Sequence, residues 1–390
     1  MPTTDVPQPD LSSTEVLATE ILETEMLAAD ATQADATRAQ VPPTDVTPAQ
    51  VTPAQVTRGQ VTPTAAGTKD TPRADGATAR PSTRTARTAR PPVRAPMRIL
   101  ISGASGFIGR ELTRQLQGDG HEVFSLVRRQ PKGPNEINWA PSAHMLDASV
   151  MDGIDAVINL SGASIGRLPW TRGYKKQILD SRVQSTRTLT EAMARATTPP
   201  KIFLNGSAVG IYGDRPGERL TEDSPRGPGF LGDVVEAWEQ AAQLRPAKTR
   251  LVTLRTGVVI GNGGSLLPVM ALTRLGLGTR LGTGGDIWPW ISLYDEAAAI
   301  RFLLTSKLSG PVNLVGPTPA TSDRITHHVA KRMHRWYPFV APSWIIGLLL
   351  QDAGPALLFS SQQILPSKLL ADGFTFRDQT VEQAIDAFLT

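Results

Sequence analysis

The stretch Arg98-Ile-Leu-Ile-Ser-Gly-Ala-Ser-Gly-Phe-Ile-Gly109 decides the fold. Its apolar run, Ile99–Ile101, predicts a buried parallel strand, and a helical pattern follows the glycines. In that setting Gly103 permits a tight turn, Gly106 lets the backbone approach a pyrophosphate, and Gly109 allows close helix packing. The alternative is a glycine-rich turn without a ligand. The pattern favours a dinucleotide site at a helix N-terminus, contacted by Gly103, Ser105, Gly106, Phe107, Ile108 and Gly109.

The next strand indicates which dinucleotide would bind. Glu122–Val127 predicts that strand, and it ends in Arg128-Arg129. An NAD-specific protein places an acidic residue near this point, where it binds the ribose 2′-hydroxyl. Two guanidinium groups instead suit a 2′-phosphate, because arginine makes charge-assisted, often bidentate contacts with phosphate. NADP is therefore the expected cofactor; the alternative is a solvated basic pair at a strand end.

Composition divides the chain near Met97. Residues 1–96 contain no Phe, Tyr or Trp, and from Val46 they repeat a pentad that begins Val-Thr-Pro-Ala-Gln. Such a segment buries too little apolar surface to offset its chain entropy, so it is expected to be disordered. Its basic stretch, residues 73–94, could touch nucleic acid, but a solvated linker is the preferred interpretation. A natural start at Met97 stays open beside Met1.

Residues 97–390 are enough for a large α/β unit with a real core. The chain has no cysteine, which excludes disulfides and thiolate chemistry. It shows no signal-peptide pattern and no apolar run of membrane length. A net charge of +4 does not require a nucleic-acid partner. The default expectation is a cytoplasmic protein acting on a small molecule.

Strands and helices continue to alternate after the first unit. Predicted strands cover Ile154–Leu160, Ile202–Leu204 and Leu251–Val259, and predicted helices cover about 174–196 and 230–244. This alternation predicts a doubly wound parallel sheet, the Rossmann arrangement. Ligands of such sheets bind at the carboxyl ends of the strands. The nicotinamide half of the cofactor is therefore expected beside Leu160, Ser161, Ser207 and Thr256.

The region from 97 onward resembles the extended short-chain dehydrogenase/reductases. Within them it is similar to the atypical subgroup of NAD-dependent epimerase/dehydratase-like proteins, which closes with a C-terminal domain of unknown function. The resemblance is carried by Gly-Ala-Ser-Gly-Phe-Ile-Gly (103–109), Val-Ile-Asn-Leu-Ser-Gly-Ala (157–163), Ser-Arg-Val-Gln-Ser-Thr (181–186), Ser-Ala-Val-Gly-Ile-Tyr-Gly (207–213), Leu-Arg-Thr-Gly-Val-Val (254–259) and Pro-Ser-Lys-Leu-Leu-Ala-Asp-Gly-Phe-Thr-Phe (366–376).

The resemblance implies a catalytic set that this chain lacks in part. The superfamily uses Asn, Ser, Tyr and Lys, and Ser207 matches the serine. The Tyr-x-x-x-Lys pair would fall at Leu231 and Val235, or one residue earlier at Phe230 and Val234. Neither register supplies a hydroxyl or an amine, and a general acid must reach the proton it moves. The usual hydride-transfer apparatus is incomplete.

Three functions stay open. The chain could be an NADP-dependent oxidoreductase or epimerase in which Ser207 orients a carbonyl, Arg182 (at the asparagine position) stabilises charge and Tyr212 acts as an acid. It could instead be a non-catalytic NADP(H) sensor, or an interaction scaffold. Each candidate also has a structural alternative: Ser207 capping a turn, Arg182 in an ion pair, and Tyr212 in packing.

The substrate side is expected late in the chain. We predict a Rossmann domain over 97–316, with a substrate-side insertion at about 261–286, and a smaller helical domain over 317–390. Trp288 and Trp290 would stack on a ring or, in the preferred interpretation, pack in the core. The apolar segment 344–350 suits core or a subunit contact, so a homodimer is one option. No metal site is expected, since His327, His328 and His334 on one helix lack acids at ligand spacing.

Overall fold

The computed structural model describes residues 95–350 and 353–389. Their centre is a seven-stranded sheet in the order β12-β7-β5-β4-β1-β2-β3, in which every neighbouring pair is parallel. The order reverses between β1 and β4, so the crevice of the sheet opens there. The strands are β1 (Arg98–Ser102), β2 (Glu122–Val127), β3 (Glu136–Asn138), β4 (Ala156–Asn159), β5 (Ile202–Ala208), β7 (Arg250–Thr256) and β12 (Gly310–Leu314).

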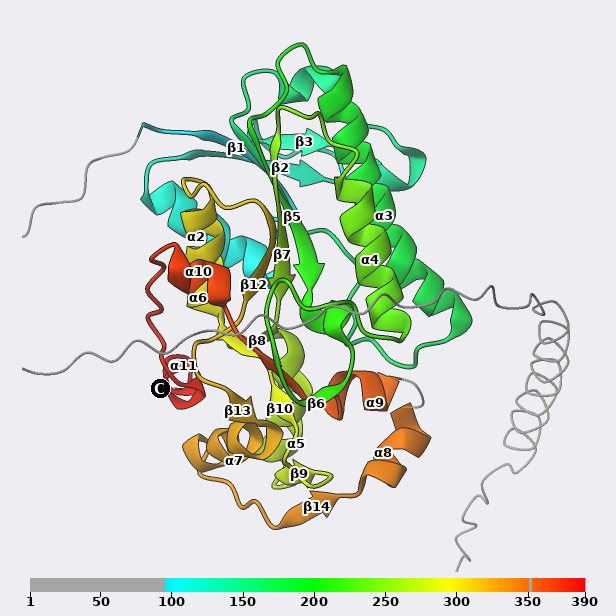
Figure 1. Cartoon of the computed structure of the whole chain (residues 1–390), viewed down its shortest axis with the longest axis vertical. Helices are drawn as coiled ribbons and strands as arrows, with labels where there is room; N and C mark the ends of the chain where they lie inside the picture. The colour runs from blue at the N-terminus through cyan, green and yellow to red at the C-terminus, as the bar shows by residue number, and fades with distance from the viewer. Residues whose placement is uncertain (1–94, 351–352, 390) are drawn as a thin grey trace, which may run out of the picture. The chain divides into compact units, whose positions relative to one another are not determined.

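Helices cover both faces of this sheet (Figure 1). On one face α2 (Phe107–Gly118) packs beside α6 (Leu293–Leu303), and on the other α3 (Arg172–Arg195) packs beside α4 (Phe230–Ala242). The interiors of the central strands are buried because both faces are covered, even where polar residues such as Asn159, Asn205 and Arg255 occur in them. Two cores result, one beneath α2 and α6 and one beneath α3. The predicted doubly wound Rossmann fold is confirmed.

Below the carboxyl ends of the strands lies a second region, built from short strand pairs. In each of three pairs a strand from beyond residue 316 joins one from before it: β13 (Ala320–Thr321) with β10 (Ile287–Trp288), β14 (Phe339–Ala341) with β9 (Thr279–Leu281), and β15 (Gln362–Ile364) with β6 (Arg215–Leu220). A fourth pair joins β8 (Val258–Ile260) to β11 (Trp290–Ser292). The helices here are α5 (Leu267–Arg274), α7 (Ser322–Arg332), α8 (Ser343–Leu350), α9 (Ala353–Leu358) and α11 (Val381–Asp386), whereas α10 (Ser367–Ala371) packs on β12 of the large sheet, beside α6 (Figure 1).

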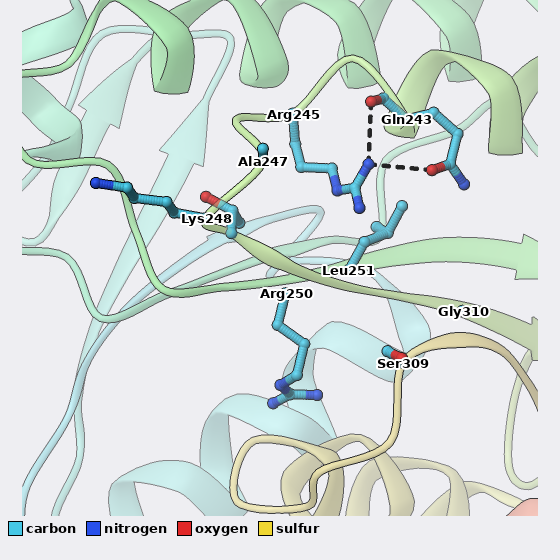
Figure 2. Close-up of a pocket in the computed structure, with 9 residues that line it drawn as sticks. Gln243, Arg245, Ala247, Lys248, Arg250, Leu251, Ser309 and Gly310 are labelled. Carbon is cyan, nitrogen blue, oxygen red and sulfur yellow. Dashed lines mark hydrogen bonds between the residues drawn. The ribbon is translucent and has the colours of Figure 1, made fainter.

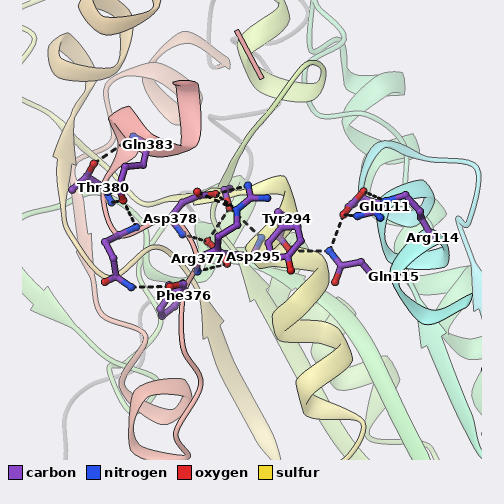
Figure 3. A network of polar contacts seen from close by, with 12 residues as sticks. Glu111, Arg114, Gln115, Tyr294, Asp295, Phe376, Arg377, Asp378, Thr380 and Gln383 are labelled. Atoms are coloured by element: carbon purple, nitrogen blue, oxygen red, sulfur yellow. Dashed lines mark hydrogen bonds and ion pairs between the residues drawn. The ribbon is translucent and has the colours of Figure 1, made fainter. Parts of the chain in front are cut away.

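A polar network ties the C-terminal segment to the sheet's helices (Figure 3). The buried carboxylate of Asp295, at the start of α6, accepts hydrogen bonds from the backbone N–H groups of Arg377 (2.8 Å) and Asp378 (2.9 Å). The Arg377 guanidinium lies 3.9 Å from the centre of the Tyr294 ring. Gln115 of α2 in turn donates to the Tyr294 carbonyl. The segment around Arg377 and Asp378 is thus anchored at the start of α6, which in turn contacts α2.

Several boundaries differ from the sequence-based expectations. The expected strand 251–259 divides at Gly257, because β7 pairs with β12 up to Thr256 whereas Val258 begins the pairing of β8 with β11. Gly257 lies so close to that neighbour that a Cβ there would be 2.2 Å from the Pro289 carbonyl oxygen. The chain after residue 317 is not wholly helical, since it forms three short strands. His334 lies beyond the end of α7 with a φ of +51°, so the expectation of three histidines on one helix was wrong.

Other expectations are resolved by burial. Trp288 and Trp290 pack in the core, with their indole N–H groups donating to backbone carbonyls, so the packing interpretation is confirmed. Trp344 and Leu348 are exposed, which leaves the homodimer a prediction. Residues 1–94, with the repeat and the basic stretch, lie outside the described residues. The division at residue 316 also stays a prediction.

Candidate functional site

The turn between β1 and α2 leaves no room for side chains. Gly103 has a φ of +77°, and a Cβ there would lie 2.8 Å from the Leu160 carbonyl oxygen. The Gly106 N–H donates to the Gly103 carbonyl (2.9 Å), and a Cβ on Gly109 would lie 2.2 Å from that same oxygen. The first turn of α2 has neither a side-chain cap nor an acidic residue. Its N–H groups therefore suit an anion such as a pyrophosphate.

The remaining residues of the loop surround this turn. Ser105 is exposed, and its carbonyl accepts a hydrogen bond from the Arg110 side chain. The Phe107 ring lies against a second glycine loop, where a Cβ on Gly263 would come within 2.6 Å of it. Ile108 is half-buried on α2. The expected nucleotide contacts of Ser105, Phe107 and Ile108 stay predictions.

The two arginines at the end of β2 differ in their surroundings. Arg129 makes a bidentate ion pair with Glu136 of β3, and that guanidinium holds the pKa of the Glu136 carboxyl well below its ordinary value. Arg128 is exposed and makes no hydrogen bond or ion pair with any residue that the structure describes. From the sequence, both arginines were equal candidates for the 2′-phosphate. In the structure Arg129 is paired with Glu136, whereas the Arg128 guanidinium has no partner among the described residues.

A buried polar chain joins the ends of three neighbouring strands. The hydroxyl of Ser102 donates to Asn159 Oδ1 (2.6 Å), and the Asn159 amide donates to Thr186 and to Asn205 Oδ1 (2.8 Å). Asn159 Oδ1 also accepts the N–H of Ser161 (3.2 Å), one of the residues expected beside the nicotinamide. Buried groups so fully paired are rigid, so this chain holds the carboxyl ends of β1, β4 and β5 in place. Sequence analysis missed these residues.

Ser207 joins a second buried network. Its hydroxyl donates to Glu239 Oε1 of α4 (2.6 Å). Glu239 also forms a two-pronged ion pair with Arg255 of β7, at 2.9 and 3.0 Å. Only 10% of the Arg255 side chain and 17% of the Glu239 side chain is exposed, so each needs the other. A charge within an apolar strand was the signal for this pair, which sequence analysis did not use.

Tyr212 lies at the far end of that network. It is fully buried; its hydroxyl donates to Asn313 Oδ1 (2.6 Å) and accepts from Arg255 (3.0 Å). Burial raises the pKa of the phenol. These contacts account for the residue by packing and hydrogen bonding, and they give it no exposed hydroxyl with which to protonate a substrate.

Arg182 lies on α3 beside the end of β4. Its guanidinium is 5.2 Å from the centre of the Trp238 ring and contacts Gly162, where a Cβ would lie 3.1 Å from the guanidinium carbon. It donates to the carbonyl of Ile178 in its own helix (3.0 Å). Burial lowers its pKa to about 10. The ion pair offered as its structural alternative is absent among the described residues.

The helix α4 carries the positions of the superfamily's tyrosine and lysine. Val234 and Val235 are buried in apolar clusters, and the Leu231 side chain lies against Gly210. The other position, Phe230, packs edge-on against Trp170. Neither register places a proton-donating group here.

Thr256, the fourth residue expected beside the nicotinamide, meets a buried acid. Its hydroxyl donates to Glu296 Oε1 (2.8 Å), while Glu296 Oε2 has no hydrogen-bond partner among the described residues. Glu296 is fully buried, and burial raises the pKa of its carboxyl to about 8. The protonated form is therefore favoured in the folded chain.

We expect the wild type to lose stability relative to Glu296→Gln as pH rises from 5 to 8. The unfolded chain releases this proton near the ordinary pKa of 4.5, whereas the folded chain keeps it until about 8. The stabilisation is complete below the lower value and is lost toward the higher one. One pKa unit corresponds to about 1.4 kcal/mol. Between pH 5 and 8 the free energy of unfolding of the wild type should therefore fall, relative to that of Glu296→Gln, by at least that amount. Urea unfolding of both proteins at several pH values measures it, and a pH-independent gap would contradict the assignment.

A hollow of about 350 Å³ opens at the opposite edge of the sheet (Figure 2). Arg250 and Gly310, which line it, are the first residues of β7 and β12. Arg245 bonds to Gln243 of its own loop, and Arg250 bonds to the carbonyls of Leu303 and Leu308. Ligands of doubly wound sheets bind at the carboxyl ends, so this hollow is not the candidate site.

Within residues 95–350 and 353–389, no helix is both long and apolar enough to cross a membrane. Nor do three or more His, Asp or Glu side chains gather there as metal ligands.

The region described above matches known proteins over nearly its whole length. Residues 99–316 match the model of the NAD dependent epimerase/dehydratase family, and residues 341–388 match a domain of unknown function, DUF1731. An epimerase family protein of Mycobacterium bovis is 37% identical over 292 residues, which cover 74% of this chain and 96% of that protein. Human epimerase family protein SDR39U1 is 34% identical over 285 residues, covering 72% and 95%.

Solved structures agree with this assignment. The crystal structure of human SDR39U1 (isoform 2) with NADPH superposes with a TM-score of 0.69 at 31% identity, covering 75% of this chain and 99% of that one. A nucleoside-diphosphate sugar epimerase from Corynebacterium glutamicum gives a TM-score of 0.62 at 32% identity, covering 76% and 58%. Together with the glycine loop and the sheet order, these matches show that the chain belongs to the NAD dependent epimerase/dehydratase family.

Proposed function

We propose that this protein is an NADP(H)-dependent oxidoreductase or epimerase acting on a carbonyl or sugar-nucleotide-like small molecule. The observation that carries the proposal is the side-chain-free turn at Gly103, Gly106 and Gly109, which opens at the switch point of the sheet. A pyrophosphate fits there against the uncapped N-terminus of α2. The NADPH-bound relative supports the choice of nucleotide.

Arg128 is the proposed contact of the 2′-phosphate. It is exposed at the end of β2, and no described residue neutralises it, whereas Arg129 is engaged by Glu136. The two arginines were predicted together; we now assign the main contribution to Arg128.

At the reacting end, the proposal gives Ser207 the role of orienting the substrate carbonyl. In the chain without substrate the Ser207 hydroxyl donates to Glu239, which the Arg255 pair holds; when substrate binds, the serine would turn this single O–H donor from Glu239 to the carbonyl oxygen. Bound NADPH supplies a hydride; the chain supplies the orientation of the acceptor. Because Tyr212 is buried and fully bonded, we do not propose it as the acid.

A non-catalytic NADP(H)-binding module is the second candidate. It is favoured by α4, which has aliphatic or aromatic side chains wherever the superfamily has its tyrosine and lysine. The two functions differ in turnover: only the enzyme would consume NADPH with a panel of ketones, aldehydes and nucleotide sugars, and only its rate would fall in Ser207→Ala.

Nucleotide binding to the full chain tests the shared part of both functions. We expect Arg128→Ala to weaken NADPH binding by about tenfold or more, because a charged hydrogen bond is worth roughly 1.5–3 kcal/mol, and to leave NADH binding unchanged. Arg129→Ala, the matched control, should have a smaller effect, since Glu136 already occupies that guanidinium. Calorimetric titration with both nucleotides measures this. Equal affinity of the wild type for NADH and NADPH would contradict the assignment of NADP.

A further inference from the structure

Arg182 is a largely buried cation whose charge no described acid balances. Among the residues that the structure describes, its guanidinium donates one hydrogen bond, to the carbonyl of Ile178, although a guanidinium has five N–H donors. Burying an unpaired charge is unfavourable, and the depressed pKa of this arginine reports the same cost. The positive charge of Arg182 would be stabilised by an anion that is not part of the chain.

The acids nearby are already engaged. Glu239, which follows the ring that Arg182 stacks on, is held by Arg255 and Ser207. Asp180, two residues earlier on α3, pairs with Lys176. None of the described carboxylates lies within ion-pair distance of the Arg182 guanidinium. The fold therefore leaves this charge unneutralised rather than compensating it locally.

The position of Arg182 links it to the reacting end of the candidate site. Its guanidinium contacts Gly162, next to Ser161 at the end of β4. The ring beneath it, Trp238, also covers Gly206, where a Cβ would lie 2.7 Å from the indole. Gly206 precedes Ser207 in β5. Arg182 thus lies against Gly162 after β4, and the Trp238 ring stands between its guanidinium and the residue that precedes Ser207.

The surroundings favour an anion further. The Tyr174 hydroxyl of α3 donates to the Ser164 carbonyl, in the loop after β4. A second cation, Arg167, lies 5.4 Å from the centre of the Tyr174 ring. The loop after β4 and the first half of α3 thereby present positive charge over aromatic surface. Such a surface binds planar anionic groups well, because guanidinium matches their paired oxygens.

We propose that Arg182 binds an anionic oxygen group of the substrate, carried as a carboxylate or a phosphate next to the reacting carbonyl. The inference rests on the proposed function, because it takes Ser207 as the reacting centre. It narrows the substrate to anionic molecules. The 2′-phosphate and pyrophosphate of the nucleotide lie elsewhere in that proposal, at Arg128 and at the N-terminus of α2.

The test uses the full chain saturated with NADP⁺, which fills the nucleotide's own phosphate sites. Pyruvate and inorganic phosphate are titrated in separate experiments, and binding is followed by tryptophan fluorescence, since Trp238 lies under the guanidinium. We expect saturable binding of at least one anion, weakened about tenfold or more in Arg182→Gln. Arg182→Lys keeps the positive charge but lacks the paired N–H donors of a guanidinium. Its anion affinity should lie between those of the wild type and Arg182→Gln. Arg187→Gln, an exposed change on the same helix, should bind as the wild type does.

Comparing pyruvate with phosphate shows whether the anionic group of the substrate is a carboxylate or a phosphate. Stronger binding of pyruvate identifies a carboxylate substrate, and stronger binding of phosphate a phosphorylated one. The inference is overturned if neither anion binds the wild type, or if Arg182→Gln binds both unchanged. It is also overturned if Arg182→Gln weakens NADPH binding instead, which would place the arginine in the nucleotide site. Absence of NADPH binding in the wild type would overturn the proposed function alone, and the anion titration would then be run without nucleotide.

Discussion

Replacing Gly109 by alanine is expected to abolish NADPH binding, with an affinity loss of at least about 100-fold, or about 2.7 kcal/mol. The new Cβ would lie 2.2 Å from the Gly103 carbonyl oxygen and 2.8 Å from the Cα of Ala104. Both are backbone atoms, so no side-chain rotation relieves the contact. The loop must move away from α2, and the Gly106 N–H moves with it. Fluorescence titration of the full chain with NADPH measures the loss.

Gly118→Ala is the matched control for this prediction. It makes the same change at the other end of the same helix, where a Cβ would meet nothing within 4 Å. Nucleotide affinity should be unchanged there, and stability unchanged or slightly raised. If Gly109→Ala bound NADPH like the wild type, the turn would not be the phosphate site.

Replacing Glu239 by alanine is expected to lower the free energy of unfolding by about 3–5 kcal/mol. The change leaves the Arg255 guanidinium buried without its carboxylate, and it removes the acceptor of the Ser207 hydroxyl. An uncompensated buried charge is costly, because the low-dielectric interior solvates it poorly. Urea unfolding followed by circular dichroism measures the loss.

Two further variants separate this effect from the loss of any ion pair. Glu236 lies one turn earlier on α4 and forms an exposed pair with Arg226, so Glu236→Ala should cost less than about 1 kcal/mol. The double variant Glu239→Leu/Arg255→Leu removes both charges and should recover much of the stability lost by the single one. Similar losses in Glu236→Ala and Glu239→Ala would show that burial does not set the cost.

Five strands of the sheet, β1, β2, β4, β5 and β7, could be predicted because each contains an apolar run; β3 and β12 were not predicted. The predicted strand Glu122–Val127 coincides with β2, since Gly120 precedes it and two arginines follow it. The short pairs β10–β13 and β15–β6 escaped prediction. They have two to six residues each and exist through partners that are distant in sequence, which no local pattern encodes.

In the candidate site, too, local motifs could be predicted from the sequence and long-range contacts could not. The glycine loop is a local motif, so its strand, turn and helix followed from residues 98–109. The partner of Ser207 did not follow, because Glu239 reaches it from a helix that begins 23 residues later. The unequal standing of Arg128 and Arg129 depends on Glu136, a residue of a neighbouring strand. Sequence therefore supplied candidate residues, and tertiary contacts decide which of those candidates are free.

The strand pairs of the second region bear on how the chain is synthesised. Once residue 316 has left the ribosome, all seven strands of the sheet exist, but β6, β9 and β10 still await β15, β14 and β13. Until those arrive, three strand edges stay open, and open edges are where nascent chains pair wrongly or aggregate. Asp295 likewise waits for the N–H groups of Arg377 and Asp378. The second region is therefore completed only when translation is nearly over, and a chain that stops early keeps its glycine loop but leaves these edges uncovered.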